Sequence, residues 1–280
     1  MPRYAIKTAP QHSQWSDILR IWKAADQMEI FESAWNFDHF YPIVGDLKGP
    51  CLEAWTTLSA LAQSTSRIRV GCMVSGMHNR HPAIAANMAA SVDIISNGRL
   101  NLGLGAGWFE PEAAAYGIDL GSIARRMDRF DEGVEVVARL LSQETTSFDG
   151  SFFHLTEARC EPKGPQKPHP PIAIGGQGEK RTLRTVARWA QMWDALRIEP
   201  AAWVRKHEIL VGYCEELGRD PKEITCSSHL MPPADADLGA LVEEAARLFE
   251  VGLDLAIFSL RPPYSLAMVE KLADVLSKGI

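Results

Sequence analysis

Short runs of β-branched and apolar residues alternate along this chain with longer segments whose apolar residues recur at helical spacing. Such alternation predicts parallel strands joined by helical crossovers. Strands are expected at residues 4–7, 33–37, 68–74, 100–105, 172–175, 192–198, 224–229 and 255–260. Helices are expected at residues 15–28, 53–64, 82–95, 123–142, 179–190, 201–217, 238–251 and 264–277. Eight strand–helix units predict an α/β fold, the closed (β/α)8 TIM barrel.

The length of the chain suits one such barrel. It has 280 residues, 46% of them hydrophobic, so a single domain over residues 1–280 is expected. Asp149-Gly150 separates two strand-like runs, residues 145–148 and 152–155, which predicts a β-hairpin excursion. The competing fold, a doubly wound open sheet, would place a Gly-x-Gly-x-x-Gly turn after its first strand. Here the first strand runs into Thr8-Ala9-Pro10.

Charge and composition exclude several classes of partner. The formal net charge is −6, whereas a nucleic-acid-binding surface normally has a clustered excess of Lys and Arg. A small-molecule substrate is therefore expected. No apolar run reaches the ~20 residues of a membrane span, and no secretion signal is visible, so a membrane protein is not expected. The five cysteines form no Cys-x-x-Cys pair and cannot all pair within one chain, which favours the reducing cytoplasm.

Working residues of a barrel lie at the carboxyl ends of its strands. The second strand leads into Asp38 and His39, a carboxylate beside an imidazole, which suits acid–base chemistry. The alternative is a helix-capping Asp beside a structural His. The third strand leads to His78 and His81, whose spacing suggests a metal. No carboxylate or cysteine follows at ligand spacing, and the first strand lacks a His-x-His pair, so no metal site is expected.

Glycine-rich turns follow the fourth and fifth strands. Gly103, Gly105, Ala106 and Gly107 would let a flat ring approach the backbone, and Trp108 would either stack on the pocket or cover the rim. The fifth strand ends in a turn that opens onto a helix expected to begin at residue 179. Backbone N–H groups beside a helix N-terminus predict a phosphate cradle there, formed by Gly175, Gly176, Gln177 and Gly178. An ordinary βα turn is the alternative, since barrel phosphate sites more often follow strands seven and eight.

In their order and spacing, several segments resemble the bacterial luciferase-like superfamily, and within it the branch that depends on the deazaflavin coenzyme F420. The segments that carry the resemblance are residues 52–58, 65–71, 80–82, 93–100, 103–108, 116–118 and 171–176. The resemblance covers most of the chain. It implies that Asp38 and His39 lie beside the cofactor ring, with His39 as the proton donor, acceptor or orienter. It also implies a non-proline cis peptide at Met73–Val74 that presses on the centre of the ring.

The resemblance has further implications for the pocket and the assembly. Ala106 and Gly107 would border the ring or its tail, and the turn from Gly175 to Gly178 would take the phosphate. Trp108 stands where the sugar-phosphate dehydrogenases of the superfamily have a glutamate, so glucose 6-phosphate is not expected as substrate. The stretch 231–237 is short for a family that often inserts a lid there, which predicts an open pocket. Pairing through outer helices predicts a homodimer.

Three functions follow as hypotheses. The first is hydride transfer between F420 and an organic substrate, in which the cofactor carries the redox chemistry and the barrel supplies position and electrostatics. The second is an FMN-dependent monooxygenase, because both branches share the glycine turns and the strand-end histidine. The third is a barrel that binds a flavin or deazaflavin without turnover, which the Asp38–His39 pair argues against.

Overall fold

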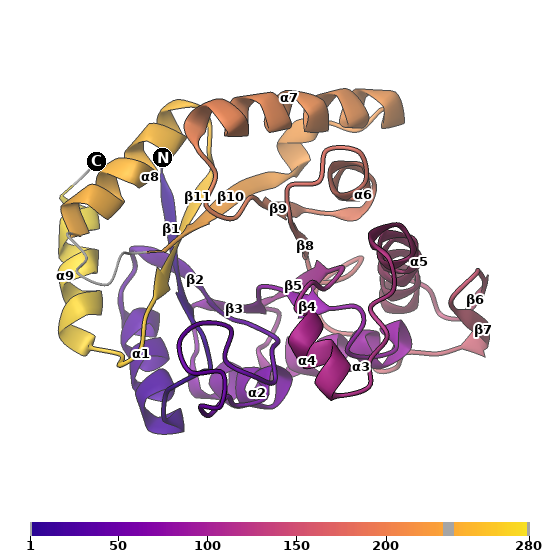
Figure 1. The fold of residues 1–280 in the computed structure, drawn as a ribbon, viewed down its shortest axis with the longest axis horizontal. Coiled ribbons are helices and arrows are strands. Elements are labelled where there is room, and N and C mark those ends of the chain that lie inside the picture. The colour runs from indigo at the N-terminus through magenta and orange to yellow at the C-terminus, as the bar shows by residue number, and fades with distance from the viewer. Residues whose placement is uncertain (1, 232–237, 279–280) are drawn as a thin grey trace.

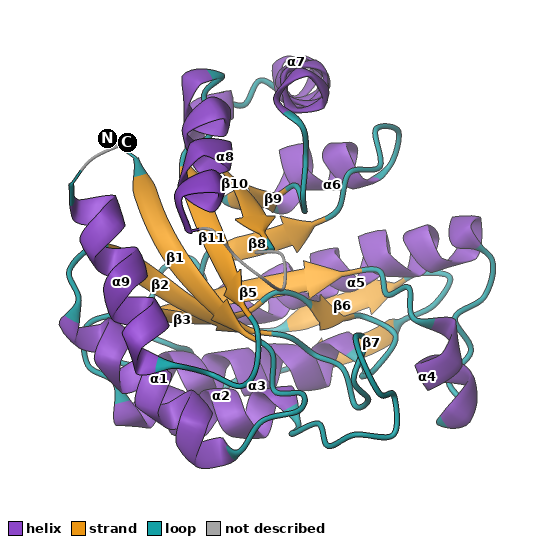
Figure 2. Cartoon of the chain, turned by 60° about the vertical axis from the view of Figure 1, so that its left-hand side comes forward, coloured by secondary structure: helices purple, strands orange, loops and turns teal. Residues whose placement is uncertain are grey.

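The computed structural model describes residues 2–231 and 238–278, and its central element is a closed parallel barrel (Figures 1 and 2). Hydrogen bonding runs in the order β3-β2-β1-β11-β10-β9-β8-β5, and β3 pairs with β5 to close the ring. The barrel strands are β1 (Arg3–Thr8), β2 (Phe31–Asn36), β3 (Arg69–Cys72), β5 (Leu100–Gly105), β8 (Ile172–Gly175), β9 (Met192–Asp194), β10 (Thr225–Leu230) and β11 (Leu255–Leu260). The predicted (β/α)8 TIM barrel is therefore confirmed.

Helices surround the barrel, as Figure 2 shows. They are α1 (Trp15–Gln27), α2 (Ala54–Ser64), α3 (Pro82–Ile95), α4 (Glu110–Ala115), α5 (Ile123–Ser142), α6 (Thr182–Trp189), α7 (Pro200–Leu217), α8 (Leu238–Glu250) and α9 (Leu266–Ser277), with a 3-10 turn η1 (Pro221–Glu223). The predicted hairpin is also confirmed, since β6 (Thr146–Asp149) pairs antiparallel with β7 (His154–Ala158). Within the described residues, no helix is both long and apolar enough to cross a membrane.

Strand alternation decides which side chains enter the barrel. A core cluster inside it contains Ala5, Trp35, Met73, Ala173, Met192, Leu255 and Ile257. Because strand side chains alternate between faces, residues two positions further along point the same way and form the next layer, at the carboxyl end. That layer contains Lys7, Phe37, Gly175, Asp194 and Ser259. The barrel interior is thus apolar below and mostly polar at its mouth.

The main differences from the predicted elements concern the third strand, the sixth strand, the helix after β8 and one additional helix. The third strand is split, because β3 ends at Cys72 and a short β4 (Ser75–Gly76) continues the pairing with β5. The sixth strand ends at Asp194, where the ladder to β10 also ends. The helix predicted from residue 179 begins at Thr182, because the preceding residues form a turn in which Leu183 N–H bonds the Gly178 carbonyl at 3.0 Å. Helix α4 was not predicted. The predicted short stretch 231–237 lies outside the described residues except for Met231.

Candidate active site

A cavity of about 260 Å³ lies at the mouth of the barrel, where the carboxyl ends of the strands meet. Its lining includes several predicted site residues, namely Asp38, His39, Met73, Val74, Gly107, Trp108, Gly175 and Gly176. Ala106 packs on the outer core instead, while Gln177 and Gly178 lie further along the turn toward α6. Sequence reasoning missed three titratable lining residues, Lys7, Asp194 and His229.

His39 is held by a carboxylate that the sequence did not point to. Its Nδ1 lies 3.0 Å from Glu112 Oε2, and the Glu112 side chain is almost fully buried in α4. Glu112 also accepts the backbone N–H groups of Phe40 and Tyr41. Burial alone raises the pKa of Glu112, but the hydrogen bonds from His39 and these amides outweigh it, so its pKa lies below its ordinary value. Glu112 is therefore a carboxylate near neutral pH.

The ionised Glu112 fixes the tautomer of His39. A carboxylate only accepts hydrogen bonds, so Nδ1 of His39 carries the proton that it donates. Nε2 is then the ring nitrogen left to exchange a proton with a bound molecule. Aromatic rings contact the imidazole edge-on, with ring centroids 5.1 Å away at Phe37, 5.7 Å at Trp108 and 5.8 Å at Phe109. Trp108, which is 58% exposed, thus covers the rim beside His39.

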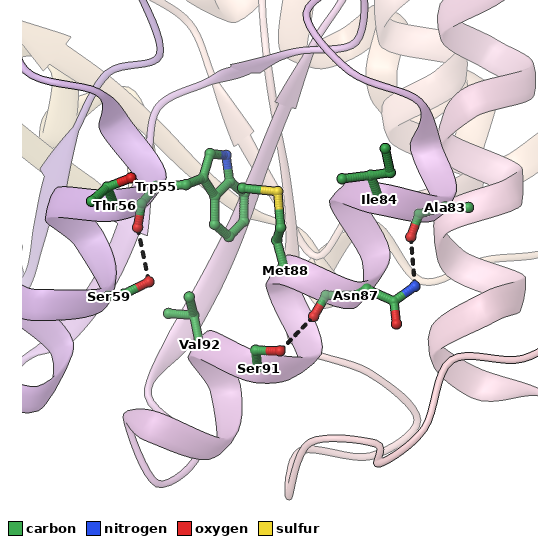
Figure 3. A pocket seen from close by; sticks show the side chains of 9 residues that line it. All are labelled: Trp55, Thr56, Ser59, Ala83, Ile84, Asn87, Met88, Ser91 and Val92. Atoms are coloured by element: carbon green, nitrogen blue, oxygen red, sulfur yellow. Dashed lines mark hydrogen bonds between the residues drawn. The ribbon is translucent and has the colours of Figure 1, made fainter.

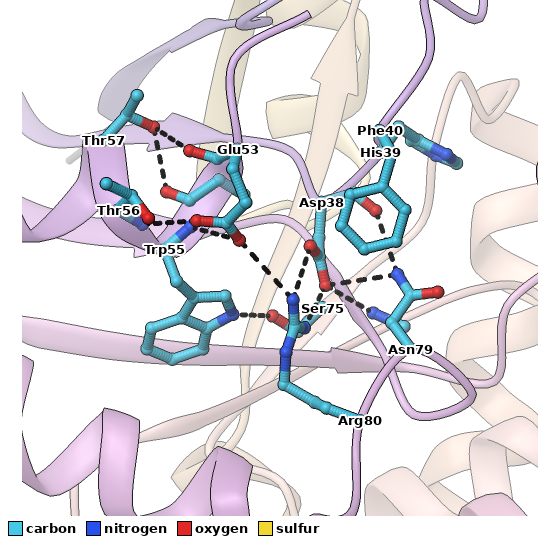
Figure 4. Close-up of polar contacts among 12 residues, drawn as sticks. Asp38, His39, Phe40, Glu53, Trp55, Thr56, Thr57, Ser75, Asn79 and Arg80 are labelled. Carbon is cyan, nitrogen blue, oxygen red and sulfur yellow. Dashed lines mark hydrogen bonds and ion pairs between the residues drawn. The ribbon is translucent and has the colours of Figure 1, made fainter. Parts of the chain in front are cut away.

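Asp38 faces away from this proton path and into an ion pair (Figure 4). Its carboxylate is fully buried and makes a two-point contact with the guanidinium of Arg80, in which Nη2 lies 3.0 Å from Oδ1. It also accepts the Gly76 N–H at 3.2 Å. Arg80 in turn lies 3.6 Å from Glu53, which caps the N-terminus of α2. This network connects the ends of β2, β4 and α2 beneath the cavity.

The glycines in β5 leave space that residues of the third strand occupy, in addition to any space they leave for a ligand. A Cβ at Gly103 would lie 1.8 Å from the carbonyl oxygen of Cys72, and one at Gly105 would lie 2.5 Å from Val74. One at Gly175 would lie 3.1 Å from the same valine. The Met73–Val74 peptide is cis, at the bond that was predicted. Val74 therefore lies between β5 and β8, where its neighbours on both strands are glycines and leave room for its side chain.

His78 occupies the space beside Gly107. This glycine has φ +86°, and a Cβ there would lie 2.0 Å from His78 Nδ1, so a side chain is excluded on both counts. Burial and the charge of Arg129 lower the pKa of His78 to about 4, which makes it neutral, and its buried Nδ1 has no hydrogen-bond partner among the described residues. His81 instead caps α3 through Ala83 N–H at 3.2 Å. The described residues contain no cluster of three groups that could hold a metal ion.

The turn after β8 offers backbone donors. Gly176 N–H bonds the Asp194 carbonyl at 3.0 Å, whereas the N–H groups of residues 177–180 bond no acceptor within the described residues. Lys206 Nζ approaches this turn, 3.0 Å from the Gln177 carbonyl and 2.9 Å from Glu179. Helix α6 begins at Thr182, two residues after this turn. The free amides and the nearby helix N-terminus suit an anionic group such as phosphate, whereas the charge of Lys206 is already paired with Glu179.

A second histidine–carboxylate pair lies on the other strands of the mouth. His229 Nδ1 is 2.6 Å from Asp194 Oδ2, and Asp194 Oδ1 accepts the Ser227 hydroxyl at 3.0 Å. Lys7 lies on β1 and is 7% exposed. Lys7, Asp194 and His229 are each the last or the last but one residue of a strand. The rule that the working residues of a barrel lie at strand ends could therefore have found them. Asp194 was hidden because the sixth strand was predicted to run four residues too far.

A different hollow lies on the outer wall, between α2 and α3 (Figure 3). Its volume is about 530 Å³, but three of its polar side chains bond the carbonyls of their own helices. Ser59 bonds Trp55, Asn87 bonds Ala83 and Ser91 bonds Asn87, each at 2.8 Å. None of the described residues that line it is titratable. The mouth of the barrel is therefore the candidate active site.

Histidine–carboxylate pairs at the mouth of such a barrel indicate an enzyme of the TIM-barrel class. The luciferase-like monooxygenase family model matches residues 3–272, nearly the whole chain. The chain belongs to this family of oxidoreductases.

Individual relatives include proteins with different activities. The F420-dependent hydroxymycolic acid dehydrogenase of Mycobacterium tuberculosis is 30% identical over 222 residues, 78% of this chain and 59% of that protein. Pyrimidine monooxygenase RutA of Yersinia enterocolitica is 37% identical over 119 residues, 42% of this chain and 32% of that protein. The chain thus spans less than two thirds of these relatives. A solved F420-dependent secondary alcohol dehydrogenase superposes with TM-score 0.85 at 18% identity, covering 99% and 98% of the two chains.

Proposed function

We propose that this protein transfers a hydride between coenzyme F420 and a small organic substrate at the mouth of the barrel. The observation that carries the proposal is the shape and polarity of the cavity and of the turn after β8. A cavity walled by Val74 and by glycines leads to a turn with free backbone amides, which suits a flat ring with a phosphate-bearing tail. The dehydrogenase relative, whose name includes F420, supports the same cofactor. When bound, the deazaflavin would supply two-electron hydride chemistry.

The residues have distinct roles in this proposal. Val74 and the backbone of Gly107 and Gly175 position the ring. His39 exchanges a proton with the substrate through Nε2, and Glu112 holds the imidazole in the required tautomer and orientation. Asp38, with its carboxylate occupied by Arg80, is a positioning residue that fixes the loop carrying His39. Trp108 covers the rim and reduces the access of water.

An FMN-dependent monooxygenase is the second candidate. It is favoured by the match to a pyrimidine monooxygenase, and the glycine turns suit either cofactor. A barrel that binds the cofactor without turnover is the third candidate, and it would not explain why the buried Glu112 orients His39. We therefore place both after the F420 proposal.

F420 is expected to bind with a dissociation constant in the micromolar range or tighter, because the cavity and the amide-rich turn together accommodate ring and phosphate. The measurement is a fluorescence titration of the purified protein with F420 and with FMN in parallel. Gly176→Ala serves as a variant, because this glycine has φ +130° and the substitution distorts the turn. It is expected to weaken binding. Tight FMN binding with no response to F420 would overturn the cofactor assignment.

The protein is expected to form a homodimer through its outer helices. Large apolar side chains remain exposed on α3, α5 and α7, including Ile84, which is 55% exposed, Ile123 and Val204. Light scattering at micromolar concentration should return twice the chain mass of 31.0 kDa. A mass of one chain across the concentration range would exclude the dimer.

A further inference from the structure

Buried polar groups on the β1, β9 and β10 side of the mouth have no part in the proton path through His39. Lys7 is 7% exposed, His229 is 8% exposed and Asp194 is 1% exposed. The Lys7 ammonium makes no hydrogen bond and no ion pair within the described residues. Because Lys7 lines the cavities at the mouth, its ammonium is free to donate a hydrogen bond to a molecule bound there.

Asp194 determines which atom of His229 is available. The carboxylate accepts from Nδ1 at 2.6 Å, so Nε2 is the free ring nitrogen. Burial lowers the pKa of His229, and although the charge of Asp194 opposes this, Lys7 adds to the lowering. Burial likewise lowers the pKa of Lys7 against the opposing charge of Asp194. The wall therefore presents one hydrogen-bond acceptor, Nε2, and one donor, Nζ.

A second cavity, of about 490 Å³, meets the first along this wall. Lys7, Ile43, Leu196 and His229 line both cavities. Beyond them, the walls of the second cavity are mainly apolar and include Phe37, Val44, Leu260 and Pro262. A molecule bound beside Lys7 and His229 would therefore bury its body against apolar side chains.

The charges around the second cavity balance. The charge of Lys7 is opposed by that of Asp194, which lines the first cavity, and the other two charged side chains that line the second cavity, Arg261 and Asp46, are exposed and of opposite sign. A carboxylate or phosphate on the ligand would leave this buried wall with an uncompensated negative charge, which is costly away from water. A hydroxyl or carbonyl oxygen would satisfy the same donor and acceptor without adding charge.

We propose that Lys7 and His229 form the subsite for the oxygen of a neutral, largely apolar alcohol or ketone whose body occupies the second cavity. The proposal deepens the proposed function and rests on it for the chemistry that follows binding. Lys7 Nζ donates a hydrogen bond to the oxygen of either ligand. His229 Nε2 accepts the hydroxyl of the alcohol.

Binding can be measured without any cofactor. Isothermal titration calorimetry compares cyclohexanol, cyclohexanone and cyclohexanecarboxylate, which share one ring and differ in the polar group. The carboxylate is expected to bind at least about tenfold more weakly than the two neutral ligands, a difference of about 1.4 kcal/mol. Lys7→Met keeps the apolar stem of the side chain, and it should weaken the binding of both neutral ligands by a similar factor of about tenfold. The matched control is Lys23→Met, at an exposed position on α1 that lines neither cavity, and it should change their affinities less than twofold.

A second measurement uses the unsubstituted protein, so it does not depend on how the variants fold. Nitrogen NMR of labelled histidine should show the Nε2 resonance of His229 shifting with cyclohexanol. Tighter binding of the carboxylate would identify an anion site and overturn the proposal. The proposal would also be overturned if Lys7→Met left both neutral affinities unchanged and the His229 Nε2 resonance did not shift with cyclohexanol. If the protein binds cyclohexanone but not F420, the proposed cofactor is refuted and the subsite is not. If it binds F420 but not cyclohexanone, only the subsite is refuted.

Discussion

Replacing His39 with alanine is expected to slow turnover ~100- to 10,000-fold while changing the dissociation constant of F420 by less than about tenfold. A proton exchanged at Nε2 is needed as the substrate reacts, so the interaction strengthens in the transition state and its loss falls on the rate. Cofactor binding should depend on Val74, the glycine backbone and the amide-rich turn, none of which the substitution touches. Single-turnover kinetics and fluorescence titration measure the two quantities separately.

Glu112→Gln is the matched variant for this experiment. It keeps the size of the side chain but replaces the charged acceptor that fixes the His39 tautomer. Its turnover should fall in the same direction as that of His39→Ala, by a smaller factor, with cofactor affinity retained. A nearly unchanged rate in His39→Ala together with a sharp loss of F420 affinity would make His39 a binding residue and contradict the catalytic assignment.

Asp38→Asn is expected to lower the free energy of unfolding by about 3 kcal/mol or more, because removing one partner of a buried ion pair leaves the other uncompensated. The Arg80 side chain is 12% exposed, and its next acidic neighbour, Glu53, is 3.6 Å away. Urea denaturation of the wild type and the variant measures the difference.

The exposed pair Arg20–Asp17 provides the control, since its side chains are 50% and 30% exposed. Asp17→Asn should cost no more than about 1 kcal/mol, as is usual for surface ion pairs. The double variant Asp38→Asn/Arg80→Gln should lose less than the sum of the two single variants, because it leaves no buried charge unpaired. Equal losses for Asp38→Asn and Asp17→Asn would show that the Asp38–Arg80 pair does not stabilise the fold.

The sequence alone determined the architecture and the location of the site. Strand and helix periodicities are local patterns, so each strand–helix unit could be found without knowing its neighbours, and their number implied the closed barrel. Strand ends then pointed to His39, and the turns after β5 and β8 were recognisable from their glycines. The cis peptide at Met73–Val74 followed from the family resemblance, not from any local pattern.

The tertiary structure alone decided which groups meet. Glu112 reaches His39 across 73 residues of sequence from a short helix with no strong local signal. Asp38 looked like a partner of His39 because it is adjacent, yet its carboxylate turns toward Arg80. The space beside the glycines of β5 is filled by Cys72 and Val74. Lys7, Asp194 and His229 come from separate strands and share a wall only because the barrel closes, which is a non-local event that no sequence window contains.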